Sequence, residues 1–316
     1  MNTLFEANAM ELIHITDVSP RDGLQNQPKH VDTQVKLELI RRLALAGVHS
    51  VEVTSFVSPK AVPQMSDAAD LLSRVMAQLP GLRASALVPN LKGLERACAA
   101  GAQEIAVVLS ATETMNRKNI NMGLSQATEV CEQTLQAAKA LGLQTRAYVA
   151  VAFECPFEGP TSLDTVVDLS RRMHAAGADE VVIADTIGAA SPGMVRDRLH
   201  VLTQAVPVGQ LAVHFHDTRG MGVANAWAAL EAGIRRFDAS AGGIGGCPFA
   251  PGAAGNLATE DLVLMSENSG FTTGIDMQAL LNAVAYAEAS LSLPLGGRST
   301  QWLRQTNKRG RTTSES

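Results

Sequence analysis

Short runs of apolar and β-branched residues recur along the chain, and the stretches between them show apolar residues at helical spacing. In residues 35–45, for example, Val35, Leu39, Ile40 and Leu43 fall on one helical face. Glycine follows several of these stretches, as is typical of a helix C-terminus. The short runs predict eight strands: Leu12–Asp17, Val51–Phe56, Ala84–Val88, Glu104–Leu109, Thr145–Ala152, Glu180–Asp185, Leu211–His216 and Phe237–Ala241.

The alternation of strands and helices predicts an α/β fold, a (β/α)8 TIM barrel with extra C-terminal helices. The strands begin about 32 residues apart on average, close to the ~31 residues per unit of a ~250-residue barrel. An open Rossmann-type sheet would carry GxGxxG after its first strand, and SPRDGLQ stands there instead. After the eighth strand, Thr259–Asn268 and Asp276–Leu291 are predicted helices. We expect one catalytic domain over residues 1–303 and a disordered polar tail over 304–316.

Composition excludes several classes of protein. With 26 Lys and Arg against 31 Asp and Glu, the net charge of −5 argues against a nucleic-acid partner. Hydrophobic residues make up 46% of the chain, enough for a large core, yet no apolar run reaches the ~20 residues that span a bilayer. The first residues show no secretory signal, and the four cysteines form no CxxC pair. We therefore expect a cytoplasmic protein with no membrane partner.

Two histidines at the end of the seventh strand predict a metal site. Side chains alternate along a strand, so His214 and His216 point to the same face, and neutral imidazole is a common metal ligand. Asp22, in the turn after the first strand, offers a carboxylate at the same end of the barrel. The set suits a six-coordinate divalent ion, and Zn²⁺ or Fe²⁺ would also fit. The alternative is a pair of buried histidines hydrogen-bonded inside the barrel.

Three further polar positions are candidate site residues. Arg21 precedes Asp22, and the pair is either functional or an ordinary surface ion pair. Glu52 lies inside a buried strand, where a carboxylate is costly unless it is paired, for instance with Arg21, or functional. Asp185 ends the sixth strand, as a catalytic residue would, but it could equally cap the following turn. Because side chains alternate along a strand, the second strand is predicted to have two faces. Glu52, Thr54 and Phe56 would lie on one, and Val51, Val53 and Ser55 on the other.

The eighth strand is followed by a glycine-rich segment, GGIGGCPFAPGAAGN, over residues 242–256. Such a segment is typical of a mobile lid, and it lacks the motifs of a phosphate-binding loop. Cys247 within it could act as acid, base or nucleophile, or be an incidental thiol. Cys98 and Cys131 lie in helical patterns and are expected to be inert.

Together these segments resemble the hydroxymethylglutaryl-CoA lyase family, within the TIM-barrel superfamily of metallolyases and acyl-condensing enzymes. The resemblance runs in order from about Ser19 to Leu262 and weakens toward Ile13 and Leu291. The GGCP motif best separates these lyases from the related synthases. The matching stretches are SPRDGLQN, VEVTSFVSPKAVPQM, ALVPNLKG, NRKNIN, CPFEG, ADTIGAASPG, HFHDTRG and GGIGGCPFAPGAAGNLATEDL.

The resemblance implies a role for each candidate residue. Arg21 would neutralise the thioester oxygen of an enolate, and Arg21 and Ser55 would contact the substrate. Cys247 would move a proton at the acetyl-CoA carbon or its partner oxygen, with Glu52 and Asp185 supporting proton traffic. A Mg²⁺ or Mn²⁺ ion would be held by Asp22, His214, His216 and Asn256.

The implied reaction is cleavage of 3-hydroxy-3-methylglutaryl-CoA to acetyl-CoA and acetoacetate. The implied partner is an acyl-CoA, the implied assembly is a homodimer or larger, and leucine degradation fits this chemistry. Lys60, Arg117 and Lys118 are candidate contacts for anionic CoA, although a solvated surface is the favoured explanation for each.

One departure from the family pattern keeps the substrate open. The family reads HDTYGQ after the second histidine, whereas this chain reads HDTRGM, with Arg219 and Met221. These residues either alter the acyl pocket or lie outside it. Three alternatives therefore stay open: the same chemistry on another 3-hydroxyacyl-CoA, an acyl-condensing synthase of the isopropylmalate or homocitrate type, and a non-catalytic acyl-CoA-binding barrel.

Overall fold

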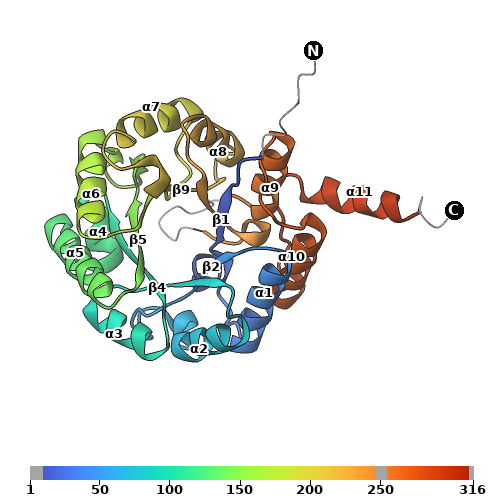
Figure 1. Cartoon of the computed structure of the whole chain (residues 1–316), viewed down its shortest axis with the longest axis horizontal. Coiled ribbons are helices and arrows are strands. Elements are labelled where there is room, and N and C mark those ends of the chain that lie inside the picture. Colours follow the sequence, from blue (N-terminus) through green and yellow to red (C-terminus); the bar gives the residue numbers. More distant parts are fainter. Residues whose placement is uncertain (1–9, 247–254, 313–316) are drawn as a thin grey trace, which may run out of the picture.

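Eight parallel strands close into a barrel in the computed structural model, which describes residues 10–246 and 255–312, with backbone alone for residues 307–312. Figure 1 shows the strands enclosed by a ring of helices. β1 pairs with β10 on one side and β2 on the other, so the sheet has no free edge. In spatial order the strands are β1 (His14–Asp17), β10 (Arg236–Ala239), β9 (Leu211–Phe215), β8 (Glu180–Asp185), β5 (Gln144–Ala150), β4 (Glu104–Ser110), β3 (Arg83–Leu87) and β2 (Ser50–Ser55).

The predicted TIM barrel is confirmed, and each of the eight predicted strands overlaps an observed one. The hairpin β6 (Glu154–Cys155) and β7 (Gly159–Pro160) is an addition after β5. The helices are α1 (Thr33–Leu45), α2 (Ala68–Gln78), α3 (Leu91–Ala99), α4 (Glu113–Ile120), α5 (Leu124–Ala140), α6 (Leu163–Ala175), α7 (Pro192–Leu202), α8 (Gly222–Glu231), α9 (Thr259–Asn268), α10 (Met277–Leu291) and α11 (Thr300–Thr312).

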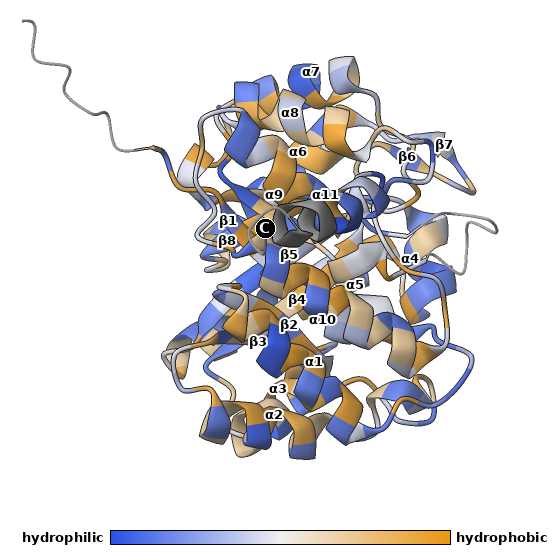
Figure 2. Cartoon of the chain, turned by 90° about the vertical axis from the view of Figure 1, so that its right-hand side faces the viewer, coloured by the Kyte–Doolittle hydropathy of each residue, from blue (hydrophilic) through white to orange (hydrophobic). Residues whose placement is uncertain are grey.

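The main hydrophobic core lies between the barrel and the helices. Helices such as α1 turn an apolar stripe inward and polar residues outward, and Figure 2 shows both kinds of residue on single helices. On α1, for example, Leu39, Ile40 and Leu43 are at most 2% exposed, and each such burial contributes about 1.5–3 kcal/mol. None of the described helices is both long enough and apolar enough to cross a membrane.

The barrel interior differs from this apolar outer layer. A small cluster there consists of Tyr148 and apolar residues that include Leu87 and Val182. Charged side chains fill much of the rest, among them Arg146 and Asp238, both 1% exposed. The interior is therefore polar as well as packed, and its charged side chains lie directly beneath the site at the barrel mouth.

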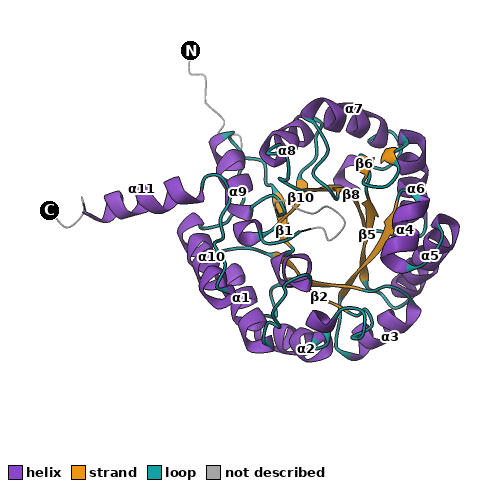
Figure 3. Ribbon diagram, turned by 180° about the vertical axis from the view of Figure 1, so that it is seen from behind, coloured by secondary structure: helices purple, strands orange, loops and turns teal. Residues whose placement is uncertain are grey.

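The C-terminal tail differs from our prediction of disorder over 304–316. Residues 304–312 belong to helix α11, which Figure 3 shows extending away from the barrel. Its first residue is anchored, because Thr300 donates to a Glu260 oxygen at 2.7 Å, and Arg304 pairs with Glu288 at 3.1 Å. Arginine, glutamine and lysine favour helix strongly, so a polar composition did not imply disorder here. Residues 313–316 lie outside the described part of the chain.

Candidate active site and metal centre

Asp22, His214 and His216 lie together at the C-terminal mouth of the barrel. One ligand atom from each lies within 4.8 Å of the other two, and the two imidazole centroids are 5.2 Å apart. His214 lies in β9 and His216 directly follows it, whereas Asp22 comes from a π-helical turn, Ser19–Gly23, after β1. The predicted clustering of these three side chains is confirmed.

The π-helical turn approaches the segment after β10 closely. Gly23 permits this, because a Cβ at that position would lie 3.0 Å from the Ile244 side chain. Asn256 joins the same cluster: its amide nitrogen donates to Asp22 at 2.9 Å and to the Ile244 carbonyl at 3.1 Å. A backbone bridge pairs Asn256 with His216. The fourth predicted ligand thus lies beside the other three.

The donor set fits a divalent cation. Among the described residues, neither Oδ1 of Asn256 nor Nδ1 of His216 has a hydrogen-bond partner, although both atoms are buried. Leaving buried polar atoms unpaired costs about 1–3 kcal/mol each, a cost that a bound ion would remove. A carboxylate, an amide oxygen and two imidazoles are ligands that Mg²⁺, Mn²⁺ and related ions accept.

The charge states of His216 and Asp22 suit metal binding, whereas at His214 a cation would have to compete with a proton. Burial, together with the charge of His214, lowers the pKa of His216 to about 4, so its imidazole is neutral near pH 7. Burial alone would raise the pKa of Asp22, but the charges of Arg21 and the two histidines, with the hydrogen bond from Asn256, together lower that pKa. For His214 burial opposes protonation, but a hydrogen bond to Asp238 and the negative charges nearby raise its pKa.

Arg21 links two carboxylates at the edge of the cluster. Its Nε donates to Oε2 of Glu52 at 2.6 Å and its Nη1 pairs with Oδ1 of Asp22 at 2.8 Å. Glu52 is fully buried, and burial raises its pKa despite the positive charge of Arg21. The expected pairing of Arg21 with Glu52 is therefore present, and it fixes the guanidinium at the mouth of the barrel.

The face assignment along β2 is wrong beyond Glu52. The pairing with β3 shifts between Glu52 and Thr54, which marks a β-bulge. Glu52 points inward to Arg21, whereas the Thr54 hydroxyl contacts the Met65 sulfur in the outer layer. Because side chains alternate along a strand and Thr54 points outward, Ser55 faces the barrel interior. Its buried hydroxyl has no hydrogen-bond partner among the described residues. The bulge thus favours the predicted substrate contact at Ser55.

Asp185 caps a turn at the end of β8. Its two oxygens accept hydrogen bonds from the backbone amides of Ala189, at 2.8 Å, and Ala190, at 3.1 Å. Burial raises its pKa to about 6, and these two hydrogen bonds, followed by the positive charges of His214 and Arg219, oppose that rise. Of the two roles predicted for Asp185, the capping contact is observed, and a role in proton traffic stays a prediction.

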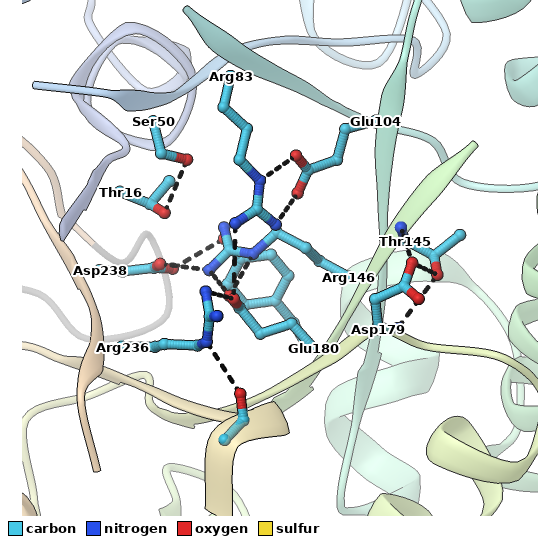
Figure 4. A network of polar contacts seen from close by, with 12 residues as sticks. Thr16, Ser50, Arg83, Glu104, Thr145, Arg146, Asp179, Glu180, Arg236 and Asp238 are labelled. Atoms are coloured by element: carbon cyan, nitrogen blue, oxygen red, sulfur yellow. Dashed lines mark hydrogen bonds and ion pairs between the residues drawn. The ribbon is translucent and has the colours of Figure 1, made fainter. Parts of the chain in front are cut away.

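The sequence did not single out three residues of the site: Arg146, Tyr148 and Asp238. Asp238 on β10 lies with Oδ2 3.3 Å from Nδ1 of His214, and it also binds Arg146 at 2.6 Å and the Tyr148 hydroxyl at 2.8 Å. Figure 4 shows Arg146 between Asp238 and Glu180. The argument used for Glu52, that a charge inside a buried strand needs a reason, applies equally to Arg146 and Asp238 and could have found them.

Cys247 and most of its segment, residues 247–254, lie outside the described residues. The two flanks of this segment border the cluster: Asn26 donates to the Gly246 carbonyl at 3.0 Å, and the amide of Asp217 donates to the Gly255 carbonyl at 3.1 Å. The segment therefore begins and ends beside two of the elements that carry the predicted ligands.

The candidate CoA contacts lie on the surface. Lys60, Arg117 and Lys118 are all exposed. Arg117 pairs with Glu113 on its own helix at 2.6 Å, and Lys118 lies over the ring of Phe157, 4.8 Å from its centroid. A contact with CoA at any of the three stays a prediction.

Known hydroxymethylglutaryl-CoA lyases resemble this chain in sequence and in fold. The model of the HMGL-like family matches residues 12–286. The mitochondrial hydroxymethylglutaryl-CoA lyase of Bos taurus is 45% identical over 274 residues, which cover 87% of this chain and 84% of that one. A hydroxymethylglutaryl-CoA lyase of Bacillus subtilis is 43% identical over 92% of this chain and 96% of that one. A crystal structure of a Bacillus subtilis HMG-CoA lyase matches with a TM-score of 0.90 at 42% identity, covering 93% of this chain and 98% of that chain.

Proposed function

This chain belongs to the HMGL-like family of lyases, and from that premise we propose that it cleaves 3-hydroxy-3-methylglutaryl-CoA to acetyl-CoA and acetoacetate with the help of a divalent cation. The observation that carries the proposal is the cluster of Asp22, His214 and His216 at the barrel mouth, with Arg21 held 2.8 Å from Asp22. It joins an oxygen- and nitrogen-rich ligand set to a fixed positive charge.

The chemistry needs both features. In a retro-Claisen cleavage the 3-hydroxyl loses its proton while the carbon–carbon bond breaks, and the leaving fragment is a thioester enolate. A divalent cation, when bound, supplies Lewis-acid polarisation of the substrate hydroxyl and carboxylate. Asp22, His214, His216 and Asn256 would hold it, and the four come from three separate segments at the barrel mouth.

Arg21 has the geometry to stabilise the enolate. Glu52 and Asp22 hold its guanidinium from two sides, at 2.6 and 2.8 Å, so the charge does not have to be reoriented as the bond breaks. The ring of Tyr148 lies 6.0 Å from the guanidinium carbon, and Arg21 is buried. We propose that a thioester oxygen binds to the part of this guanidinium that Glu52 and Asp22 leave free.

Cys247 is the proposed proton donor to the enolate, and Cys247→Ala is expected to lower turnover by at least about 10²-fold, the low end for losing a general acid–base group. Folding and metal binding should stay nearly unchanged, because the thiol is not among the proposed ligands. The measurement is steady-state turnover at saturating metal. Cys98→Ala, a change of a half-buried thiol on α3, is the matched control.

The wild-type enzyme offers a second test of the Cys247 assignment. A thiol reagent should inactivate it, and saturating substrate or product should protect it. Near-normal turnover by Cys247→Ala would remove the thiol from the mechanism. Proton transfer would then fall to a carboxylate, and Glu52 and Asp185, whose pKa values are both raised by burial, are the candidates.

The specific observation that favours another substrate is the position of Arg219. It follows β9, pairs with Glu154 of the β6–β7 hairpin at 3.3 Å, and donates to the Ala189 carbonyl at 3.4 Å. These contacts join the loops after β5, β8 and β9 at the mouth that the substrate must enter. A second candidate function is therefore the same cleavage of a different 3-hydroxyacyl-CoA.

Arg219→Tyr, which restores the family residue, is expected to shift the preference among acyl groups while leaving metal affinity unchanged. The ratio of kcat/KM values for two 3-hydroxyacyl-CoAs measures this shift. Arg196→Tyr, a change of an exposed arginine on α7, is the control. Identical ratios in Arg219→Tyr and wild type would place Arg219 outside the acyl pocket.

A turnover assay across a panel of 3-hydroxyacyl-CoAs, with Mg²⁺ or Mn²⁺, tests the proposed function. We expect the 3-hydroxy-3-methylglutaryl thioester to give acetyl-CoA and acetoacetate in equal amounts. Faster cleavage of another panel member would favour the second candidate. No cleavage of any member, with condensation of acetyl-CoA onto a 2-oxo acid instead, would favour a synthase.

Compartment, assembly and pathway stay predictions. The relatives include mitochondrial and cytoplasmic lyases, so family membership alone fixes no compartment. The cytoplasmic location, the homodimer and the link to leucine degradation are each open to direct test by fractionation, light scattering and metabolite analysis.

A further inference from the structure

We propose that Asp238 is a positioning residue that accepts a hydrogen bond from Nδ1 of His214 and thereby presents Nε2 of that imidazole to the cation. This inference rests on the metal centre in the proposed function, because it assigns a role to a residue behind one of the proposed ligands. It does not depend on which acyl-CoA the enzyme cleaves.

The barrel register brings the two residues side by side. Asp238 on β10 is the pairing partner of His214 on β9, and period two sends both side chains into the barrel. Oδ2 of Asp238 lies 3.3 Å from Nδ1 of His214. Both residues are at most 6% exposed, so water does not compete for this contact.

The neighbours of Asp238 decide which atom carries the proton. Arg146 donates to Oδ1 of Asp238 at 2.6 Å and also donates to the Tyr148 oxygen at 3.0 Å. Because the Tyr148 oxygen already accepts from Arg146, its own hydrogen points to Oδ2 of Asp238, 2.8 Å away. The carboxylate is ion-paired and acts only as an acceptor. The hydrogen between Asp238 and His214 therefore belongs to Nδ1.

A neutral imidazole with its hydrogen on Nδ1 has a free lone pair on Nε2. That nitrogen lies on the far side of the ring from Asp238. The centroid of the His214 ring lies 5.2 Å from that of His216, the neighbouring proposed ligand. A carboxylate behind a ligating histidine fixes both its tautomer and its orientation, and it makes the imidazole a stronger ligand. The contact between Asp238 and Nδ1 of His214 supplies the carboxylate of this arrangement and leaves Nε2 to the cation.

A structural role alone does not explain the contact with His214. Arg146 and Asp238 already satisfy each other, and Arg146 also binds Glu180 at 2.7 Å. From there the ion pairs lead away from the site: Glu180 pairs with Arg236 at 3.4 Å and with Arg83 at 4.0 Å, and Arg83 pairs with Glu104 at 2.5 Å (Figure 4). Buried ion pairs are weak contributors to stability, whereas the end of this network at His214 is where it meets the proposed chemistry.

The tautomer can be measured directly in the wild-type chain. The ¹⁵N resonances of the metal-free protein, labelled at histidine and recorded at alkaline pH, distinguish a protonated from an unprotonated ring nitrogen. His214→Gln assigns the resonances of His214. We expect a protonated Nδ1 and an unprotonated Nε2 at His214, and a protonated Nε2 would overturn the proposal.

Asp238→Asn removes the charge and keeps the shape. We expect it to weaken Mn²⁺ binding by about 10–100-fold, the usual effect of losing a residue that supports a metal ligand. Titration of the metal-free protein with Mn²⁺, followed by electron paramagnetic resonance without substrate, measures this. Glu104→Gln is the matched control: Glu104 belongs to the same buried network, and its hydrogen bonds go to Arg83.

The outcomes separate the alternatives. Mn²⁺ binding that is weakened in Asp238→Asn but not in Glu104→Gln supports the proposal. An Mn²⁺ affinity of Asp238→Asn within twofold of the wild type overturns it. An equal loss in Glu104→Gln also overturns it, because the effect would then come from the barrel as a whole. If Asp238→Asn does not fold, the tautomer measurement decides. A chain that binds Mn²⁺ but cleaves no acyl-CoA would contradict the proposed function and leave this inference intact.

Discussion

His216→Ala is expected to weaken Mn²⁺ binding by more than the 10–100-fold that loss of a supporting residue costs, and to reduce turnover to the level of the metal-free protein. His216 is 4% exposed, its pKa is lowered to about 4, and its Nδ1 has no hydrogen-bond partner among the described residues. The ring is therefore neutral and available to a cation. Its removal should take away a ligand without breaking a hydrogen bond at Nδ1.

Two measurements check this prediction: the Mn²⁺ dissociation constant, by titration of the metal-free protein, and turnover at saturating Mn²⁺. His200→Ala, which changes an exposed histidine on α7, should alter neither. If His216→Ala binds Mn²⁺ like the wild type, the cation is held elsewhere. The two imidazoles would then be buried histidines of the barrel, the alternative that the sequence left open.

Arg21→Met is expected to lower kcat by about 10²–10³-fold, which corresponds to roughly 2.7–4 kcal/mol of transition-state stabilisation. Metal affinity should change far less, because Arg21 is not among the proposed ligands. The physical reason is the fixed guanidinium, held by Glu52 and Asp22 at 2.6 and 2.8 Å. Steady-state kinetics and Mn²⁺ titration of the same preparation measure the two effects.

A second variant separates catalysis from charge balance. Loss of Arg21 alone leaves Glu52 buried without its partner, a change that is itself destabilising. The double variant Arg21→Met, Glu52→Gln removes that unpaired charge and keeps the shape of the carboxyl group. Turnover should stay low in the double variant. Recovery toward the wild-type rate would mean that Arg21 serves only to neutralise Glu52.

The barrel was predictable because its signal repeats. Each strand is a short apolar run, each helix shows an apolar stripe, and the spacing of about 32 residues recurs through the chain. The ligand cluster was predictable for a related reason: parallel strands bring their C-terminal ends to one mouth, so His214, His216 and Asp22 meet although they lie far apart in sequence.

The remaining features depend on contacts that no local pattern encodes. The bulge at Glu52 shifts the pairing of β2 with β3 and turns Thr54 outward, which strict alternation along one strand does not foresee. The network of Arg146 and Asp238 joins residues 92 positions apart. Helix α11 begins where Thr300 meets Glu260, a contact that the polar composition of the tail does not reveal.

The most direct test of the central claim is a cleavage assay on one preparation before and after removal of metal. The protein is treated with a chelator, the chelator is removed, and 3-hydroxy-3-methylglutaryl-CoA is added with and without Mg²⁺ or Mn²⁺. A metal-dependent lyase should be inactive when stripped, and with metal restored it should release acetyl-CoA and acetoacetate in equal amounts. Full cleavage by the stripped protein, or no acetyl-CoA after metal is restored, would contradict the account.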